Sequence, residues 1–426
     1  MDPVQATFQH LFGPEFGHGK AFDLRRLHRV LGLLGGPHAR LGPVFHVAGT
    51  NGKGSTIALM RAIAEAAGLN VNAFTKPHLF ALNERFVVRN AIASNDTLLT
   101  MADRIARIDP DITQFDAQVA TAFALFAQHP ADLTIIETGM GGRDDSTNIV
   151  ASPAATIITP IGFDHQDALG SSLEEIAAHK AGIIKRNAPV VLARQAEAAR
   201  RIVEAEAERL DAPLFRCGVE WDGYAHNGRL VVETERRALD LPLPALTGPH
   251  QADNAALACA AFLAPGPFNL ADDAFAGIGQ AQLSGRLQAL TRGALSAPVR
   301  AIGGEVWIDG AHNAHGAAAL ARALNDMQRR RKTLTIALVG LRARKDAEAF
   351  LRALAPAVDC VVAVPLAEAH QTADTIATIC NELGIRATAA GSLKAAMQNA
   401  AQFPAPRVLI CGSFLLAAEA LKLESA

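Results

Sequence analysis

The sequence is poor in cysteine, and its cysteines form no pattern. Five of them are scattered through 426 residues, without a C-x-x-C pair. This spacing argues against a disulfide framework or a thiolate zinc site, and it favours reduced, mostly buried thiols in a cytosolic protein. Excess charge is also missing, because 40 basic and 42 acidic residues nearly cancel. The basic surface that nucleic-acid binding usually needs is therefore not expected.

Long apolar runs are absent as well. No run approaches the roughly 20 residues that a membrane-spanning helix requires, and the N-terminal "MDPVQATFQHLFG" has an early acid and no signal-peptide core. We therefore expect a cytoplasmic protein with no membrane or nucleic-acid partner. Half of the residues are hydrophobic and 19% are charged, which is typical of a globular chain. Its length exceeds the roughly 250 to 300 residues of a single core, so two domains are expected.

Several catalytic templates are missing. The chain has no G-x-S-x-G nucleophile turn and no H-E-x-x-H metal motif. Two stretches approach G-x-G-x-x-G, "GMGGRD" and "GIGQAQ", but each lacks the last glycine. A dinucleotide-binding dehydrogenase is therefore a poor alternative.

The chain does contain short β-branched runs that alternate with alanine-rich helical stretches from residue 44 onward. Such alternation predicts an α/β fold with a mostly parallel sheet and helices on both faces. We expect a P-loop-type domain over residues 1–285, with a small antiparallel insertion near 214–243 that turns at Asn227-Gly228. A smaller Rossmann-like α/β domain is expected over 286–426.

The stretch "GTNGKGST" (49–56) lies between a predicted strand (44–48) and a helix predicted to begin near Ser55. Backbone N–H groups of a glycine-rich turn at a helix N-terminus bind phosphate, and Lys53 adds a mobile positive charge. The standard P-loop pattern would place glycine at Val47 and a hydroxyl at Gly54, so this is a variant in which Ser55 or Thr56 is the candidate Mg²⁺ ligand. The plain alternative is an ordinary glycine turn with a solvated lysine.

Ligands of open parallel sheets bind beyond the carboxyl ends of the strands. Glu137 ends one predicted strand, and Asp164 and His165 follow another, so a carboxylate and an imidazole are expected beside the loop. Taken singly, Glu137 also suits a helix-capping or salt-bridged acid and His165 a hydrogen-bonded loop histidine. Lys180, at the end of a short helical run, has the spacing of a surface lysine.

Nine motifs in order resemble the folylpolyglutamate synthase and dihydrofolate synthase family of the Mur-ligase superfamily. They are "HVAGTNGKGST", "TKPHL" with "NERF", "ETGMGGRDDSTN", "ITPIGFDHQDALG", "HKAGII", "TGPHQADNAA", "SGRLQ", "IDGAHN" and "CGSFLLAAE". The family's own loop is GTNGKGS, which accounts for both misfits. The resemblance implies an enzyme that uses ATP to convert a pteroate or folate carboxylate to an acyl phosphate, which the amine of L-glutamate then attacks. ADP, phosphate and an amide are the products.

The resemblance also implies roles for individual residues. It gives catalytic roles to Lys53, to Lys180 as a carbamylated lysine and to His312, and it gives Mg²⁺, as two ions, to Ser55, Glu137 and His165. Nucleotide contacts are implied for the loop residues Gly49, Thr50, Asn51, Gly52, Lys53, Gly54, Ser55 and Thr56, and for Asn254, Arg286 and Asp309. Substrate contacts are implied for Lys76, Pro77, His78 and Asp145.

Three positions depart from the family pattern. Lys76 replaces a usual serine, Asp144 a usual hydrophobic residue, and His179 a usual glutamate. Lys76 and Asp144 are expected either to pair or to signal an altered substrate. The alternatives to a bifunctional ligase acting on dihydropteroate and reduced folates are a monofunctional relative, a P-loop ATPase or kinase, and a nucleotide-binding protein without catalysis. A monomer is expected.

Overall fold

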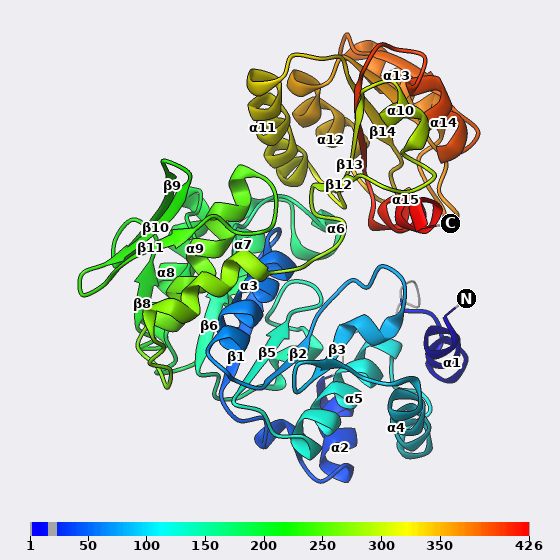
Figure 1. The fold of residues 1–426 in the computed structure, drawn as a ribbon. Helices are drawn as coiled ribbons and strands as arrows, with labels where there is room; N and C mark the ends of the chain where they lie inside the picture. Colours follow the sequence, from blue (N-terminus) through cyan, green and yellow to red (C-terminus); the bar gives the residue numbers. More distant parts are fainter. Residues whose placement is uncertain (1, 16–23, 426) are drawn as a thin grey trace. The chain divides into compact units, whose positions relative to one another are not determined.

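The computed structural model describes residues 2–15 and 24–425, and the chain divides into two compact units. The first unit runs to Ala245 and resumes over Ala252–Gln282, and the second consists of Leu246–Gln251 and the described residues from Leu283 onward. The chain thus passes between the units close to residue 285, but it also enters the second unit briefly at residues 246–251. Figure 1 shows helices around a sheet in each unit.

The first unit is built on an eight-stranded sheet in the order β4-β3-β2-β5-β1-β6-β7-β8. Six of these strands are parallel, and β3 and β4 are antiparallel. The bounds are β1 Val44–Ala48, β2 Val71–Phe74, β3 Phe86–Val88, β4 Ala91–Ile92, β5 Leu133–Glu137, β6 Ala155–Ile158, β7 Val190–Leu192 and β8 Leu214–Arg216. The strand predicted over 44–48 is confirmed with both of its bounds, and β5 ends at Glu137 as predicted.

Helices cover both faces of this sheet. They are α1 Pro3–Phe12, α2 Leu24–Leu33, α3 Lys53–Ala66, α4 Asn95–Ile108, α5 Gln114–Gln128, α6 Gln166–Leu169, α7 Leu173–Ala181, α8 Glu197–Arg209 and α9 Pro249–Leu263. Because side chains alternate along a strand, neighbouring residues of β1 serve opposite faces. Phe45 packs on Phe262 of α9, with ring centroids 5.2 Å apart, whereas His46 reaches Thr147 on the other side, 2.9 Å away.

A three-stranded antiparallel sheet follows, made of β9 Trp221–His226, β10 Arg229–Thr234 and β11 Ala238–Pro242. Asn227 and Gly228 form its two-residue turn with φ of 49° and 77°, as the sequence predicts. The insertion begins later than expected, because β8 pairs in parallel with β7 of the large sheet. Gly223 of β9 packs directly on Ala256 of α9, leaving no room there for a β-carbon.

The second unit has a six-stranded sheet in the order β12-β13-β17-β14-β15-β16, parallel except for β12. Its strands are β12 Gln288–Leu290, β13 Glu305–Ile308, β14 Thr335–Val339, β15 Cys360–Ala363, β16 Arg386–Ala389 and β17 Arg407–Cys411. Its helices are α10 Ala297–Ala301, α11 Ala314–Arg330, α12 Ala347–Leu354, α13 Ala373–Glu382, α14 Leu393–Ala400 and α15 Phe414–Ser425. Helices α11, α12 and α13 share a buried core with this sheet, and α14 and α15 pack on β14 and β17.

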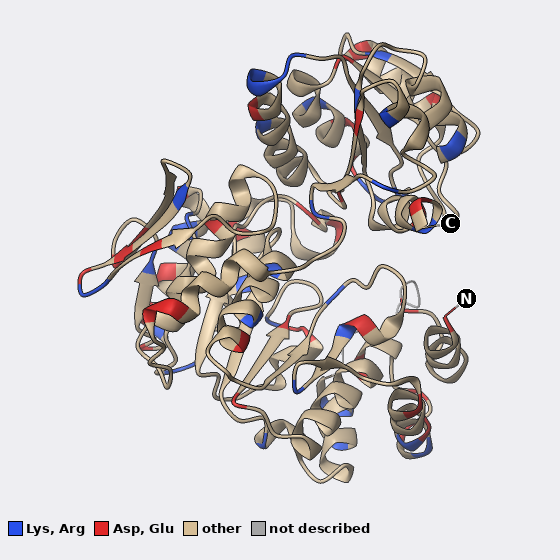
Figure 2. Ribbon diagram, viewed as in Figure 1, with Lys and Arg blue, Asp and Glu red and all other residues tan. Residues whose placement is uncertain are grey.

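The strands carry little charge. Figure 2 shows the central strands of both sheets mostly in tan, with lysine, arginine, aspartate and glutamate gathered on helices and loops. All five cysteines are free thiols; three are buried and two half-buried, as expected. Within residues 2–15 and 24–425, every helix is too short or too polar to cross a bilayer.

Candidate active site

The loop after β1 has the backbone geometry of a phosphate-binding turn. Gly49 and Gly52 have φ of 146° and 88°, values that residues with a β-carbon rarely adopt. Gly52 is the N-cap of α3, and the Thr56 N–H donates to its carbonyl oxygen over 2.8 Å. The helix therefore begins at Lys53 and not near Ser55, so Lys53, Gly54 and Ser55 form its first turn. Because α3 begins at Lys53, this lysine lies at the positive end of the helix dipole.

Neighbouring segments fix the shape of the loop. The backbone N–H groups of Thr50 and Asn51 both donate to Pro160 O, over 3.0 and 3.3 Å, and the Thr50 hydroxyl donates to Gly162 O over 2.9 Å. Pro160 and Gly162 follow β6, which lies next to β1. The loop is thus tied to the adjacent strand end.

Asn254 approaches the loop from α9. A β-carbon on Gly52 would lie 2.6 Å from Asn254 Oδ1, and the Asn254 side chain is 5% exposed. The sequence resemblance implies that Asn254 contacts adenine, which stays a prediction. The structure shows in addition that the Asn254 side chain packs against the loop at Gly52.

Lys53 lies folded over the loop that precedes it. Its Nζ donates to Gly49 O over 3.1 Å and to Thr50 O over 3.2 Å, and it lies 4.0 Å from Glu137 Oε1. The side chain is 17% exposed, against 4% for Glu137. A cation that donates to two carbonyl oxygens, with a carboxylate 4.0 Å away, is well placed to exchange these partners for phosphate oxygens.

Lys180 is buried, so the interpretation of it as a surface lysine is wrong. It lies near the end of α7, is 4% exposed, and donates from Nζ to Gly49 O over 2.9 Å. Burial lowers the pKa of its amine to about 7, and the nearby positive charge of Lys53 acts in the same direction. The spacing of residues along the nine-residue helix α7 did not predict this burial, because it does not show which side of the helix is covered. Lys180 lies on the covered side, next to the loop that follows β1.

The three expected metal ligands come from neighbouring strand ends. Ser55 follows β1 and is buried, Glu137 ends β5 and is buried, and His165 follows β6 with its ring 45% exposed. Glu137 Oε2 accepts the Lys76 N–H over 3.0 Å, and His165 Nε2 lies 3.9 Å from Asp164 Oδ2. In the described ranges, His, Cys, Asp and Glu side chains form no group of three that could hold a metal ion.

The segment 76–78 follows β2, next to β5. Its Lys76-Pro77 peptide bond is cis, and Lys76 Nζ lies 5.2 Å from the centre of the Phe115 ring on α5. Burial lowers the pKa of Lys76, although Glu15 and Asp145 oppose that effect. His78 Nδ1 accepts from Arg85 Nε over 3.0 Å. Burial, reinforced by Arg85, lowers the pKa of His78 to about 4, so its ring is neutral at physiological pH.

A buried ion pair between Arg85 and Glu15 lies next to this segment and was not predicted from the sequence. Arg85 donates to both carboxylate oxygens of Glu15, over 2.7 and 3.1 Å, and to Gln118 Oε1 over 2.7 Å. Arg85 is 5% exposed, and paired guanidinium and carboxylate groups of this kind fix geometry. The "NERF" motif contained Arg85, but only the fold brings Glu15, 70 residues earlier, to meet it.

The other substrate candidate, Asp145, is 1% exposed and accepts hydrogen bonds from its own loop. Its neighbour Asp144 points elsewhere. Asp144 Oδ2 lies 3.7 Å from His179 Nδ1, so the suggested pair between Lys76 and Asp144 is wrong. The carboxylates that interact electrostatically with Lys76 are instead those of Glu15 and Asp145. Two of the three departures from the family pattern therefore meet each other.

In the second unit, the expected residues gather beyond β13 and β17. Asp309 accepts the N–H groups of Leu287 and Ala311, over 2.8 and 2.7 Å. The Arg286 guanidinium lies 4.3 Å from the centre of the Phe414 ring, and the His312 ring packs edge-on against the same ring at 5.7 Å. His312 Nδ1 lies 3.0 Å from Gly310 O, so this nitrogen carries a hydrogen and donates it to the carbonyl oxygen. The Phe414 ring thus contacts both Arg286 and His312.

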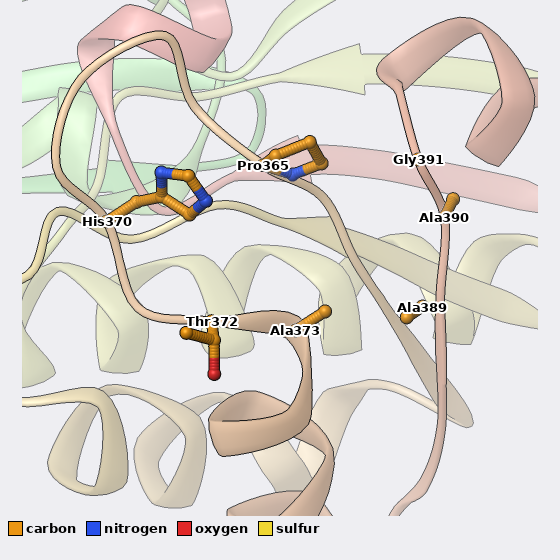
Figure 3. A pocket seen from close by; sticks show the side chains of 7 residues that line it. All are labelled: Pro365, His370, Thr372, Ala373, Ala389, Ala390 and Gly391. Atoms are coloured by element: carbon orange, nitrogen blue, oxygen red, sulfur yellow. The ribbon is translucent and has the colours of Figure 1, made fainter.

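A separate cavity of about 370 Å³ lies in the second unit, at the carboxyl ends of β15 and β16. Its lining is mostly apolar, with His370 and Thr372 as the larger polar side chains (Figure 3). Thr372 caps α13, and His370 donates from Nδ1 to Glu368 O over 2.8 Å. None of the expected site residues lines this cavity.

Comparison with known proteins places these features in one class. Residues 47–262 match the Mur ligase middle domain, and residues 297–414 match the Mur ligase glutamate ligase domain. The dihydrofolate synthase/folylpolyglutamate synthase of Bacillus subtilis is 36% identical over 320 residues, which cover 71% of each chain.

Solved structures agree along nearly the whole chain. Escherichia coli FolC in complex with DHPP and ADP has a TM-score of 0.84 and 30% identity, covering 98% of this chain and 96% of that chain. The bifunctional folylpolyglutamate synthase/dihydrofolate synthase of Yersinia pestis, complexed with AMPPNP and Mn ion, has a TM-score of 0.84 and 28% identity, covering 99% and 98%.

The two matched domains are those of Mur ligases. Within that class, the chain belongs to the dihydrofolate synthase/folylpolyglutamate synthase family. The family resemblance and the predicted α/β fold are confirmed, as is the expected enzyme class, an ATP-dependent ligase that forms amide bonds. The roles of individual residues stay predictions.

Proposed function

We propose that this protein joins L-glutamate to dihydropteroate, giving dihydrofolate, and to reduced folates, giving folylpolyglutamates. The observation that carries the proposal is the meeting of two lysines at one carbonyl group. Lys53 and Lys180 both donate to Gly49 O, and Glu137 lies beside Lys53. An acyl-phosphate route needs positive charge where a phosphoryl group is transferred, and Lys53 supplies it at the N-terminus of α3. The Escherichia coli and Yersinia pestis structures named above contain ADP and AMPPNP, respectively.

The reaction divides into two steps. A carboxylate oxygen of the substrate attacks the γ-phosphorus of ATP, the bond to the bridging oxygen breaks, and ADP leaves. The amine of L-glutamate then attacks the acyl carbon, loses a proton, and expels phosphate as the amide forms. In the first step, Lys53 would exchange its bonds to Gly49 O and Thr50 O for bonds to the transferred phosphoryl oxygens.

Divalent metal fits the donor set of the first unit. Ser55, Glu137 and His165 offer a hydroxyl, a carboxylate and an imidazole, which Mg²⁺ and Mn²⁺ accept. Because these are only three protein ligands, phosphate oxygens and water would complete the coordination. The metal would neutralise the charge of the nucleotide phosphates. Mn is bound in the Yersinia pestis relative.

A carbamate on Lys180 suits its environment. A carbamate forms when a neutral amine attacks CO₂ and loses a proton, and a pKa of about 7 leaves much of the Lys180 amine neutral. The product would carry a carboxylate-like charge close to Lys53 and the loop. Lys180 thereby changes from a cation to a metal-binding anion.

The test is ADP release from purified protein, with and without L-glutamate, in the presence of dihydropteroate or a tetrahydrofolate. We expect turnover only when both the carboxylate substrate and glutamate are present. Turnover without glutamate would instead indicate an ATPase or kinase. A requirement for dihydropteroate, with no response to reduced folates, would reduce the proposal to a monofunctional enzyme.

We further propose a monomer in the cytoplasm. Five free thiols suit a reducing compartment. Light scattering coupled to size-exclusion chromatography tests the monomer, which has an expected mass of 44.8 kDa. A mass of twice this value would refute it.

A further inference from the structure

A hydrogen-bonded chain connects the strand of the nucleotide loop to Asp145. His46 lies in the middle of β1, is fully buried, and places Nε2 2.9 Å from Thr147 Oγ1. Thr147 Oγ1 lies 2.6 Å from Asp145 Oδ1, and the Thr147 N–H donates to the same oxygen over 3.0 Å. None of the residue roles expected from sequence uses His46 or Thr147.

Counting hydrogens assigns the direction of each bond in this chain. A carboxylate only accepts, so the single hydroxyl hydrogen of Thr147 is donated to Asp145. Thr147 must then accept from His46, which requires the imidazole hydrogen on Nε2. His46 Nδ1 is left as a bare nitrogen, and it is a buried atom with no hydrogen-bond partner in the described ranges. Burial, helped by Lys185, lowers the pKa of His46 to about 3, so the ring stays neutral.

Among residues 2–15 and 24–425, these hydrogen bonds leave Asp145 with one acceptor position unused. Each carboxylate oxygen offers about two lone-pair sites. Oδ1 accepts twice from Thr147, whereas Oδ2 accepts once from these residues, from the Met140 N–H over 2.7 Å. The remaining site is therefore on Oδ2. A β-carbon on Gly139 would lie 2.8 Å from this oxygen and would collide with the Phe115 ring, so a glycine there keeps Asp145 and Phe115 close together.

We propose that His46 is a positioning residue for the substrate. Acting through Thr147, it holds the Asp145 carboxylate so that Oδ2 accepts a hydrogen from a ring or exocyclic N–H of the substrate heterocycle. This inference rests on the proposed function, because it takes Asp145 to face that heterocycle. His46 also lies three residues before Gly49. The strand that leads into the glycine-rich loop therefore also positions Asp145, the acid expected to contact the substrate.

Two substitutions at His46 test the proposal. Leucine fills a similar volume but donates no hydrogen bond, whereas glutamine can carry an N–H to the place of Nε2. We expect His46→Leu to raise the KM for dihydropteroate roughly tenfold, the effect of one lost hydrogen bond, while the KM for ATP stays within about twofold. His46→Gln should restore most of the affinity. A parallel rise of both KM values, or failure of glutamine to rescue, would indicate a structural role and overturn the proposal.

A second pair of variants guards against misfolding of the first. Thr147→Ser keeps the hydroxyl and Thr147→Val removes it at nearly constant volume, so only the valine variant should raise the KM for dihydropteroate. An unchanged KM in both valine and leucine variants would refute the role of His46 while leaving the proposed function intact. A wild-type enzyme that fails to use dihydropteroate would refute both. Melting temperatures measured in parallel show whether each variant is folded.

Discussion

The amine of Lys180 lies 2.9 Å from the carbonyl oxygen of Gly49, although 131 residues separate them in the sequence. The same oxygen accepts from Lys53 over 3.1 Å. Two lysines from different helices, Lys53 of α3 and Lys180 of α7, therefore converge on the backbone at the first glycine of the loop. Burial, together with the nearby charge of Lys53, lowers the pKa of Lys180 to about 7, so that part of its amine is neutral at a pH where an exposed lysine is fully charged.

Lys53→Ala should abolish turnover. Removing a cation that stabilises the transferred phosphoryl group costs on the order of 100-fold or more in kcat. Steady-state ADP release measures this loss. Lys332→Ala is the matched control, because Lys332 is an exposed lysine of the second unit and its removal should leave kcat unchanged. Full activity in the Lys53 variant would contradict the assigned role.

Activity should depend on CO₂ in a pH-dependent way. Only the neutral amine of Lys180 reacts with CO₂, and because its pKa is about 7, the neutral fraction rises as pH increases from about 6 to 8. In CO₂-depleted buffer we expect low activity at both pH values and, when CO₂ is supplied at one fixed concentration, a larger recovery at pH 8 than at pH 6. Mass spectrometry under native conditions should show an added mass of CO₂ that Lys180→Arg abolishes. Activity that ignores bicarbonate at both pH values would exclude a functional carbamate.

Lys76→Ser should alter substrate preference and leave phosphate chemistry intact. The buried ammonium group lies over the Phe115 ring, and we expect a ligand oxygen or ring nitrogen to accept a hydrogen bond from it. Loss of a hydrogen bond to a charged group changes kcat/KM by roughly tenfold or more. The measurement is the ratio of kcat/KM for dihydropteroate to that for a reduced folate. Lys76→Arg should keep the wild-type ratio, and an unchanged ratio in the serine variant would remove Lys76 from the substrate site.

Gly52→Ala should damage the loop more than a matched change at the other end of α3. Gly52 and Gly68 both have positive φ, 88° and 77°, so alanine strains the backbone at each position by about 1 to 2 kcal/mol. Only at Gly52 would the β-carbon meet another group, Asn254 Oδ1 at 2.6 Å, because Gly68 has open space around it. We expect ATP affinity, measured by calorimetry, to fall in Gly52→Ala and to be retained in Gly68→Ala. Equal ATP affinities in the two variants would show that the Asn254 side chain can move away from the new β-carbon without affecting ATP binding.

The pair formed by Asp144 and His179 should contribute little stability. Asp144 is 63% exposed and His179 30% exposed, and exposed ion pairs are worth about 1 kcal/mol or less. A double-mutant cycle with Asp144→Leu and His179→Leu, followed by urea unfolding, should give a coupling free energy below about 1 kcal/mol. A larger coupling would mean that these two departures from the family pattern stabilise each other.

The sequence predicts the parts of this molecule that depend on local chemistry. The glycine-rich loop, the buried strands and the Asn227-Gly228 turn follow from residue types and spacing, and each is confirmed. Lys180 shows the limit, because its burial depends on which side of α7 the sheet covers, and periodicity over nine residues is too short to decide that. His46 gave one usable signal, a polar residue in the apolar strand "VFHVA". Its partner Thr147, 101 residues later, is visible only in the fold.

The three-stranded insertion has a consequence for the nucleotide loop. Gly223 of β9 presses against Ala256 of α9, and two residues earlier on that helix Asn254 presses against Gly52. The insertion is thus connected to the glycine-rich loop through α9, although its strands lie outside the large sheet. Substitutions on the insertion's packed face, such as Gly223→Val, would shift the helix and be felt as altered nucleotide affinity. The three-stranded insertion therefore contributes, through α9, to the conformation of the glycine-rich loop.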